Sequence, residues 1–233
     1  MKGQRVIVVG GTSGMGRATA RAAAARGAEA IAAGRRPVAE REPAAGVRDV
    51  VADVTDPASV RALFDAPVDH VLVTASPGRA GPLLEQEPEE ARSFLDGKLF
   101  GAWLVARYAA PRLRAGGSLT YVTGAAVVRP PSDAATVVAA FAGVEGLTRA
   151  LALELGPIRV NAIRPGYTDS EMWNGLEPAE RTALRERVAA AMPVRRMGAP
   201  EDIADAALFL MGNPQVTGAI LEVSGGETLV DAL

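Results

Sequence analysis

The sequence predicts an α/β fold: one domain with a Rossmann-type, doubly wound parallel sheet and helices on both faces. Short runs rich in branched aliphatic residues alternate with longer segments rich in Ala, Leu and Arg, which is the pattern of βαβ units. A glycine-rich segment follows the first short run and precedes the first long one. The 233 residues are 48% hydrophobic and 22% charged, enough for one large core, so we expect a single domain over 1–233.

The strand candidates are mostly apolar along their length, as expected of a parallel sheet covered on both faces. In chain order they are Val6–Val9, Ala28–Ala33, Arg48–Ala52, His70–Thr74, Ser118–Thr123, Arg159–Ile163 and Ile220–Val223. Several helix candidates begin with the proline that suits a first helical position. They are Gly16–Arg26, Pro57–Phe64, Pro88–Leu113, Thr136–Leu155, Pro178–Ala191 and Pro200–Met211. Residues 167–197 interrupt the strict alternation, and we expect them to form a lid over the ligand.

Composition excludes several classes of function. The chain has no cysteine and one histidine, so disulfides, thiolate metal sites and histidine clusters are excluded, and we expect no metal. The formal charge is −2, with both signs mixed along the chain, which argues against nucleic acid or anionic lipid as a partner. No apolar run approaches membrane-spanning length and no leader pattern is present, so we expect no membrane partner and a cytoplasmic protein.

The segment after the first strand candidate predicts a phosphate-binding turn. Glycines at 10, 14 and 16 permit a tight turn and let the backbone approach a pyrophosphate. The helix that follows directs unpaired N–H groups and the positive end of its dipole at that anion. A plain strand-to-helix turn is the structural alternative. The predicted contacts are Gly10, Thr12, Ser13, Gly14, Met15 and Gly16.

The end of the second strand candidate predicts which dinucleotide binds. A protein selective for NAD is expected to carry an acidic residue there, which bonds the ribose hydroxyls. This sequence instead continues with Arg35 and Arg36, whose guanidinium groups match a 2′-phosphate in charge and shape. The alternative is a pair of solvated arginines. We therefore expect NADP(H).

With these motifs in order, the chain resembles the short-chain dehydrogenase/reductase family over nearly its whole length. Gly10, Gly14 and Gly16 match the family's TGxxxGxG motif, with Val9 in place of the leading threonine. Further matching segments are Asp53–Asp56 for the adenine-contacting segment, Asn161–Gly166 for the NAxxPG turn, Arg196–Ala204 after the lid, and Val216–Gly218 with Gly225–Gly226 near the C-terminus. Several motifs in the family's order are far more specific than a single glycine motif.

The resemblance implies further cofactor contacts. Asp53 and Val54 correspond to the adenine segment, although Asp53 reads equally well as a helix-capping or turn residue. Ser170 corresponds to a threonine that bonds the nicotinamide amide, with a helix N-cap as the alternative. Two more implied contacts, Pro165 and Gly166, lie in the NAxxPG turn. The last two are Thr74 and Ala75. They begin a turn that ends at Gly78 and that differs from the family's Asn-Asn-Ala-Gly sequence.

The family's catalytic residues are where the resemblance fails. Its tyrosine and lysine fall on Val137 and Phe141, its serine on Gly124, and its asparagine on Lys98. This result does not depend on the alignment, because the chain's only lysines are Lys2 and Lys98 and no tyrosine has a lysine four residues later.

Two substitutes can be named. The long side chain of Lys98 could bring its ammonium into the space that the family's catalytic lysine occupies, and burial there would lower the pKa of Lys98. The alternative is a lysine on the protein surface. A hydroxyl could replace the tyrosine; Tyr167 follows the NAxxPG turn, and packing in the lid is its alternative role. The other hydroxyls considered are Thr123, Ser76 and Ser132.

The leading functional hypothesis is an NADP(H)-dependent oxidoreductase for a small molecule, with an unconventional proton donor. The alternatives are a dinucleotide sensor, or a cyclase or isomerase that uses the same cleft without net redox chemistry. The resemblance also implies a homodimer or homotetramer that assembles through the helices predicted at Pro88–Leu113 and Thr136–Leu155.

Overall fold

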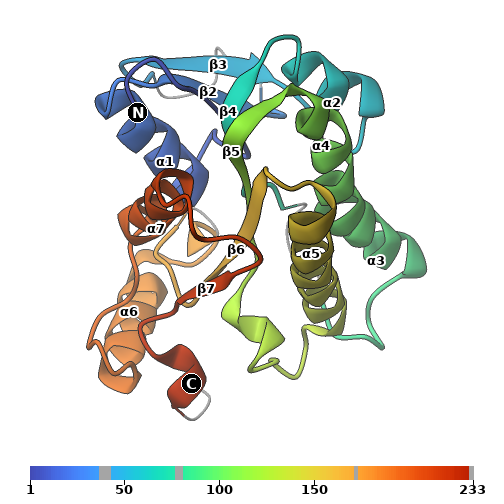
Figure 1. Ribbon diagram of the computed structural model, residues 1–233. Helices are drawn as coiled ribbons and strands as arrows, with labels where there is room; N and C mark the ends of the chain where they lie inside the picture. The colour runs from blue at the N-terminus through green and yellow to red at the C-terminus, as the bar shows by residue number, and fades with distance from the viewer. Residues whose placement is uncertain (37–42, 77–80, 171–172, 231–233) are drawn as a thin grey trace.

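A seven-stranded parallel sheet forms the centre of the protein in the computed structural model, which describes residues 1–36, 43–76, 81–170 and 173–230 (Figure 1). The strand order is β3-β2-β1-β4-β5-β6-β7. Chain order reverses direction between β1 and β4, which is the switch point where ligands bind in doubly wound sheets. The strands are β1 (Arg5–Val9), β2 (Glu29–Gly34), β3 (Val47–Val51), β4 (Val68–Val73), β5 (Leu113–Val122), β6 (Arg159–Pro165) and β7 (Ile220–Val223).

Helices cover both faces of the sheet, as predicted. Helices α1 and α7 pack together on one face, and α2, α4 and α5 lie on the other (Figure 1). The alternation of side chains along β1 supplies both cores, because Val6 and Val8 face α1 and α7 whereas Ile7 and Val9 face the opposite layer. The helices are α1 (Gly14–Ala25), α2 (Pro57–Leu63), α3 (Pro88–Leu95), α4 (Gly101–Ala109), α5 (Ala135–Glu154), α6 (Pro178–Ala191) and α7 (Pro200–Gly212).

The prediction of one continuous helix over Pro88–Leu113 was wrong. A π-helical turn, Asp96–Phe100, separates α3 from α4, and a 3₁₀ turn at Ala110–Arg112 follows α4. Pro111 has no N–H to continue the α-helical ladder, which accounts for the end of α4. The strand β5 then begins at Leu113 instead of Ser118, across an irregularity in its pairing with β4. The π turn matters because it contains Lys98.

Helix α5 is long and unusually apolar. Among the described residues it is the one helix whose length and mean hydropathy of 1.4 would also suit a membrane span. Within the fold it connects β5 to its neighbour β6 and packs against β6 and the π turn. Its outward face is built largely from small residues, including the exposed Ala139, Ala142 and Gly146. An apolar face of this kind fits a helix that is covered by another protein surface.

Candidate functional site

The glycine turn lies at the carboxyl end of β1 and is tied to the end of β4. Gly10 has a φ of +92°, and a Cβ on it would lie 2.5 Å from both the Ala75 nitrogen and Thr74 Oγ1. A Cβ on Gly16 would collide with the Gly10 carbonyl oxygen. The Thr74 hydroxyl donates a hydrogen bond to that same oxygen over 3.0 Å. Glycine is therefore required at both positions for the turn to pack this closely.

A cavity of about 600 Å³ opens beside this turn, at the switch point between β1 and β4. It brings together thirteen of the fifteen predicted cofactor contacts; Pro165 and Gly166, which lie at the end of β6, are not among its lining residues. The thirteen are Gly10, Thr12, Ser13, Gly14, Met15, Gly16, Arg35, Arg36, Asp53, Val54, Thr74, Ala75 and Ser170. Sequence positions from four separate strand ends thus converge on one space.

The two arginines after β2 line this cavity near the glycine turn. Arg36 donates a hydrogen bond from Nη2 to the Thr12 carbonyl oxygen over 3.3 Å. Asp53 accepts hydrogen bonds from the Thr55 nitrogen (2.9 Å) and hydroxyl (2.8 Å), so it is a turn residue that also lines the cavity. The hydrogen bond from the Thr55 backbone N–H is the main cause of the lowered pKa of Asp53, and the charge of Arg35 lowers this pKa further. The N-cap of α2 is Asp56, so the capping role considered for Asp53 was wrong.

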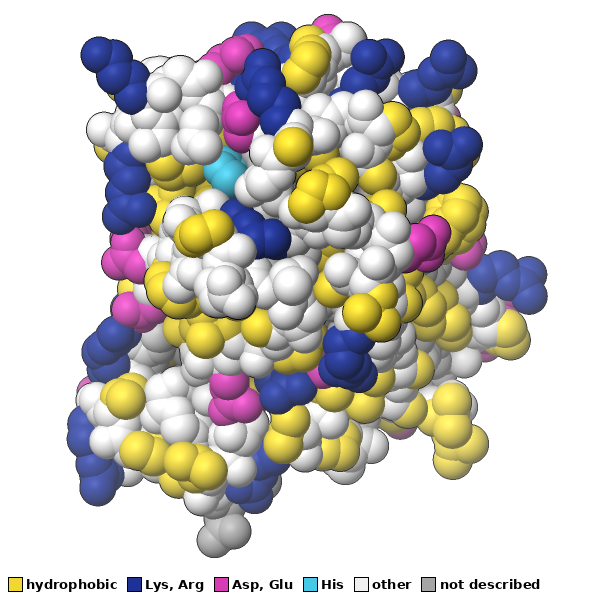
Figure 2. Space-filling view, in the orientation of Figure 1, with side chains coloured by type: hydrophobic (Ala, Val, Ile, Leu, Met, Phe, Trp, Pro, Cys, Tyr) yellow, Lys and Arg dark blue, Asp and Glu magenta, His cyan; other side chains and the backbone are white. Residues whose placement is uncertain are grey.

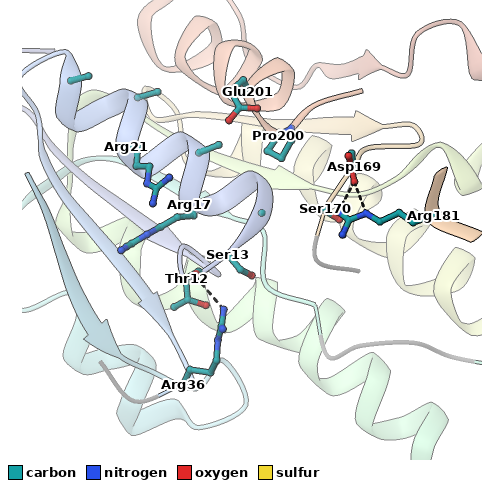
Figure 3. A pocket seen from close by; sticks show the side chains of 14 residues that line it. Thr12, Ser13, Arg17, Arg21, Arg36, Asp169, Ser170, Arg181, Pro200 and Glu201 are labelled. Carbon is teal, nitrogen blue, oxygen red and sulfur yellow. Dashed lines mark hydrogen bonds and ion pairs between the residues drawn. The ribbon is translucent and has the colours of Figure 1, made fainter. Parts of the chain in front are cut away.

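A second cavity of about 750 Å³ lies on the outer side of the glycine turn (Figure 3). Arg17 and Arg21 reach it from α1, and Asp169 and Arg181 reach it from the predicted lid. The Asp169 carboxylate accepts a hydrogen bond from Arg181 Nη2 over 2.7 Å and another from Arg185. These pairs fasten α6 to the segment after β6. Within the predicted lid, residues 171 and 172 lie outside the described residues, as do Pro77 and Gly78 of the altered turn.

Lys98 is buried, which excludes the surface alternative. Its side chain crosses toward the sheet, and the residue is 5% exposed. Its ammonium donates hydrogen bonds to the carbonyl oxygens of Val122 (2.8 Å) and Ala75 (3.1 Å), and lies 5.1 Å from the Phe141 ring centroid. Burial lowers its pKa to about 8. An ammonium has three N–H donors, and here two carbonyl oxygens and one aromatic ring face surround it. Through the two carbonyl contacts, Lys98 joins the ends of β4 and β5.

The three other residues that the resemblance aligns with the family's catalytic set, Val137, Phe141 and Gly124, carry no polar side chain. Val137 and Phe141 lie one turn apart on α5. A Cβ on Gly124, just after β5, would lie 2.8 Å from Phe141 Cε2. The aromatic ring thus fills the space that a side chain at 124 would need. None of these three residues can exchange a proton.

Tyr167 lies directly after the Pro165–Gly166 turn. Its ring stacks on Trp173, with centroids 6.0 Å apart, and Trp173 Nε1 donates to the Thr168 carbonyl oxygen over 2.9 Å. The Tyr167 backbone N–H donates to Glu227 Oε2 over 2.8 Å. Burial, with the nearby charge of Glu227, raises the pKa of the Tyr167 hydroxyl. Tyr167 therefore packs against Trp173 beside the turn, which agrees with the packing role weighed for this residue.

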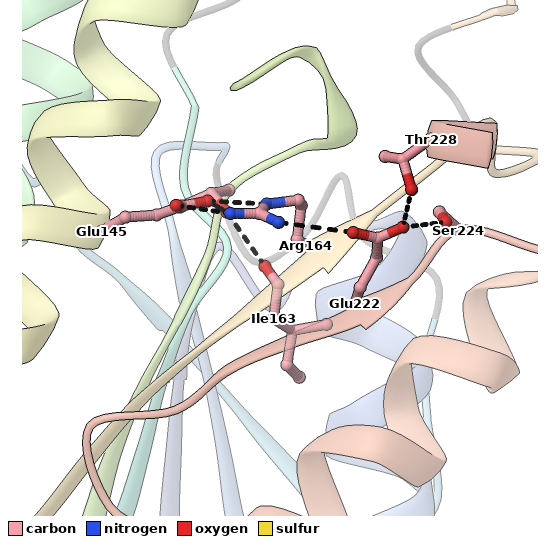
Figure 4. Close-up of polar contacts among 7 residues, drawn as sticks. Glu145, Ile163, Arg164, Glu222, Ser224 and Thr228 are labelled. Carbon is pink, nitrogen blue, oxygen red and sulfur yellow. Dashed lines mark hydrogen bonds and ion pairs between the residues drawn. The ribbon is translucent and has the colours of Figure 1, made fainter. Parts of the chain in front are cut away.

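Sequence reasoning missed a chain of charged groups that joins α5, β6 and β7 (Figure 4). Arg164 holds Glu145 of α5 through two hydrogen bonds, from Nε (2.9 Å) and Nη2 (2.7 Å), and reaches Glu222 of β7 from Nη1 over 3.3 Å. Glu222 accepts further hydrogen bonds from Ser224 and Thr228. The Thr123 hydroxyl donates to Glu145 Oε1, so it is occupied too. A signal was present, since Glu145 interrupts an otherwise apolar helical stretch.

Comparison with known proteins identifies the class. The family model described as enoyl-(acyl carrier protein) reductase matches residues 9–228. A short-chain dehydrogenase/reductase of Stachybotrys chlorohalonatus, ATR9, is 32% identical over 98% of both chains. A cis-4-hydroxycyclohexanecarboxylate dehydrogenase of Sinomonas cyclohexanicum is 37% identical over 96% of both. A small-chain dehydrogenase solved in complex with NADPH superposes with a TM-score of 0.86 at 32% identity, covering 98% of this chain and all of that one.

This chain therefore belongs to the short-chain dehydrogenase/reductase family, a family of oxidoreductases. The predicted resemblance and the predicted Rossmann-type fold are both confirmed.

Proposed function

We propose that this protein is an NADP(H)-dependent oxidoreductase that acts on a small molecule with atypical catalytic residues. The observation that carries the proposal is the single cavity in which the glycine turn, Arg35 and Arg36 meet, with no acidic residue at the end of β2. A family relative solved with NADPH supports the same cofactor.

The residues of the cavity fit the parts of a dinucleotide phosphate. The glycine turn and the first turn of α1 hold the pyrophosphate, since their N–H groups and the helix dipole favour an anion. Arg35 and Arg36 hold the 2′-phosphate, and Asp53 and Val54 border the adenine. The nicotinamide end lies among Thr74, Ala75, Pro165, Gly166 and Ser170. When bound, the cofactor supplies hydride transfer.

Lys98 serves this site as a positioning residue. Its ammonium joins the carbonyl oxygens of Ala75 and Val122, so it fixes the separation of two strand ends beside the proposed nicotinamide site. The Phe141 ring covers the ammonium on its third side. Tyr167, the first residue of the proposed lid at 167–197, contributes to the wall of the substrate site.

Calorimetric titration with NADPH and NADH tests the cofactor assignment. We expect the wild type to bind NADPH at least tenfold more tightly than NADH. Substituting Arg35→Ala should weaken NADPH binding and leave NADH binding nearly unchanged, because it removes a partner of the 2′-phosphate alone. Arg36→Ala should weaken NADPH binding more than NADH binding, because Arg36 also donates to the Thr12 carbonyl oxygen of the glycine turn. Arg92→Ala is the matched control, since this exposed arginine of α3 lies outside the cavity. Equal affinity for the two cofactors, or no binding of either, would contradict the proposal.

A non-redox cyclase or isomerase, or a dinucleotide sensor, is the second candidate. The observation that favours it is the apolar group of Val137, Phe141 and Gly124, which can shape a substrate without exchanging protons with it. Product formation without net NADPH oxidation would identify the non-redox enzyme. Tight NADPH binding without any turnover across a panel of ketones and imines would identify the sensor.

We also propose a homodimer or homotetramer that assembles through α4 and α5, in the cytoplasm. Phe100 and Trp103 are 48% and 44% exposed and stack on each other with centroids 5.6 Å apart. Leu153 of α5 is 89% exposed. A second copy of the chain would cover this apolar surface, which is costly to leave in water.

A further inference from the structure

The proposed redox function needs a proton donor, and the groups described so far do not supply one. Addition of hydride to a carbonyl carbon places negative charge on the oxygen, which then needs a proton. Val137, Phe141 and Gly124 have none to give. The ammonium of Lys98 is engaged by two carbonyl oxygens and an aromatic face, and the Thr123 hydroxyl donates to Glu145. Burial moves the pKa of Tyr167 further from neutrality, which makes this hydroxyl a weaker acid.

One carboxyl group lies against the turn that is assigned to the nicotinamide. Glu227 begins the 3₁₀ turn Glu227–Leu229 that follows Gly225 and Gly226. Its Oε2 accepts the Tyr167 N–H over 2.8 Å and sits so close to Gly166 that a Cβ there would collide with it. The backbone of Ser224 requires glycine at 166, and the absence of a side chain there leaves the space that the Glu227 carboxyl group occupies.

The chain holds Glu227 in place from the lid side too. A Cβ on Gly226 would lie 2.6 Å from Pro193 Cγ, and a Cβ on Gly225 would lie 2.7 Å from Val194 Cγ2. The C-terminal turn is therefore packed between the end of the lid and the Pro165–Gly166 turn. Glu227 is half-buried, and the Tyr167 N–H holds its carboxyl group beside the Pro165–Gly166 turn.

The electrostatic surroundings of Glu227 suit proton exchange. Burial is the main cause that raises its pKa above the usual value, and the charge of Glu222 on β7 adds to it. The hydrogen bond from Tyr167 and the charge of Arg129, in the segment after β5, act in the opposite direction. Asp133 and Arg187 face the adjoining Tyr167 ring. A carboxyl group with a raised pKa holds its proton closer to neutral pH, as general acids do.

We propose that Glu227 is the proton-exchanging residue of this site, in place of the family's tyrosine. The inference rests on the proposed redox function. In reduction of a carbonyl, hydride adds to the carbon, the π electrons pass to the oxygen, and the oxygen takes the proton of the Glu227 carboxyl group. The resulting carboxylate regains a proton from solvent. Oxidation of an alcohol runs the same steps in reverse, with the carboxylate as the base.

Glu227→Gln tests the proposal, because glutamine can still accept the Tyr167 N–H while it has no acidic proton. With NADPH and the fastest ketone of a substrate panel, we expect kcat to fall at least a hundredfold, with the Kd for NADPH within about twofold of the wild type. The wild-type kcat for reduction should decrease as pH rises through the pKa of Glu227, and Glu227→Asp should retain part of the activity with a shifted pH profile. The matched control is Glu85→Gln, which changes an exposed glutamate that lines neither cavity and should leave kcat and its pH profile unchanged.

A measurement on the protein without substrate keeps the test independent of turnover. Carbon-13 NMR of labelled glutamate carboxyl groups, assigned with Glu227→Gln, should give Glu227 a pKa above the ordinary 4.5, and its signal should shift when NADP⁺ is added. Wild-type kcat and an unchanged pH profile in Glu227→Gln would overturn the proposal, as would a Glu227 signal that does not respond to NADP⁺. Failure of the redox function is a different result, since the wild type itself would then oxidise no NADPH with any ketone or imine of the panel.

Discussion

The Nζ atom of Lys98 lies 5.1 Å from the centroid of the Phe141 ring, while its hydrogen bonds go to the carbonyl oxygens of Ala75 and Val122. Helix α5, the π turn and two strand ends therefore meet at one buried charge. We infer that position 141 corresponds to the family's lysine and position 98 to its asparagine. On that alignment an aromatic ring stands at 141 and a lysine at 98, and the ammonium of Lys98 links two strand ends.

The buried charge predicts a pH-dependent stability. The pKa of Lys98 is about 8 in the folded protein and about 10.5 in the unfolded chain, so the unfolded chain binds more protons between these values. Wild-type stability should therefore rise relative to Lys98→Met as pH increases from about 8 to 10.5, by roughly 3 kcal/mol at most. Urea denaturation of both proteins at several pH values measures the difference. Lys2→Met, at an exposed position, is the control and should show no such rise; a pH-independent difference for Lys98→Met would contradict the burial of this ammonium.

Gly124 and Phe141 should be energetically coupled. The Cβ of Gly124→Ala would lie 2.8 Å from Phe141 Cε2, so the substitution should destabilise the fold by about 1–3 kcal/mol through overpacking. Phe141→Leu makes room for the methyl group, and the double variant should lose clearly less stability than the two single variants together. A double-mutant cycle by chemical denaturation measures the coupling. Simple additivity would show that the ring moves aside freely.

Removing only one partner of the ion pair between Glu145 and Arg164 should strongly lower the free energy of unfolding. Glu145 and Arg164 side chains are 5% and 15% exposed, so Glu145→Leu leaves a buried guanidinium with only Glu222 as a partner. We expect a loss of about 3–5 kcal/mol in unfolding free energy, and a much smaller loss when Arg164→Met is added. Glu222→Gln is the comparison, because its side chain is 32% exposed and the effect should be smaller. Equal losses in Glu145→Leu and Glu222→Gln would argue against this account.

The proposed interface between copies predicts a change in oligomeric state. Trp103→Glu and Leu153→Glu place a charge in the apolar surface of α4 and α5, so light scattering coupled to size-exclusion chromatography should show dissociation toward monomers. Leu84→Glu changes a leucine that is 97% exposed outside these two helices and should leave the assembly intact. A wild-type protein that is monomeric at high concentration would refute the proposed assembly.

The fold could be predicted almost completely from the sequence, because hydrophobic periodicity and the prolines and glycines at the joins are local signals. The exception was the region 88–113, where one helix was expected and four helical segments are present. A π turn inserts one extra residue into a helix without a composition signal that distinguishes it from α-helix. Lys98 of this turn donates to carbonyl oxygens at the ends of β4 and β5, which are distant in the chain.

The candidate site also has features that the sequence predicts and features that only the tertiary structure decides. The glycine turn and the arginines after β2 can be read from the sequence, because short motifs carry them. Which polar groups meet at the site depended on the tertiary structure. The contacts of Arg164 with Glu145 and Glu222, and of Glu227 with Tyr167, join residues that lie between 19 and 60 positions apart. Such pairs form only when the sheet brings its strand ends to one edge and folds the C-terminal turn against them, and no local pattern specifies that convergence.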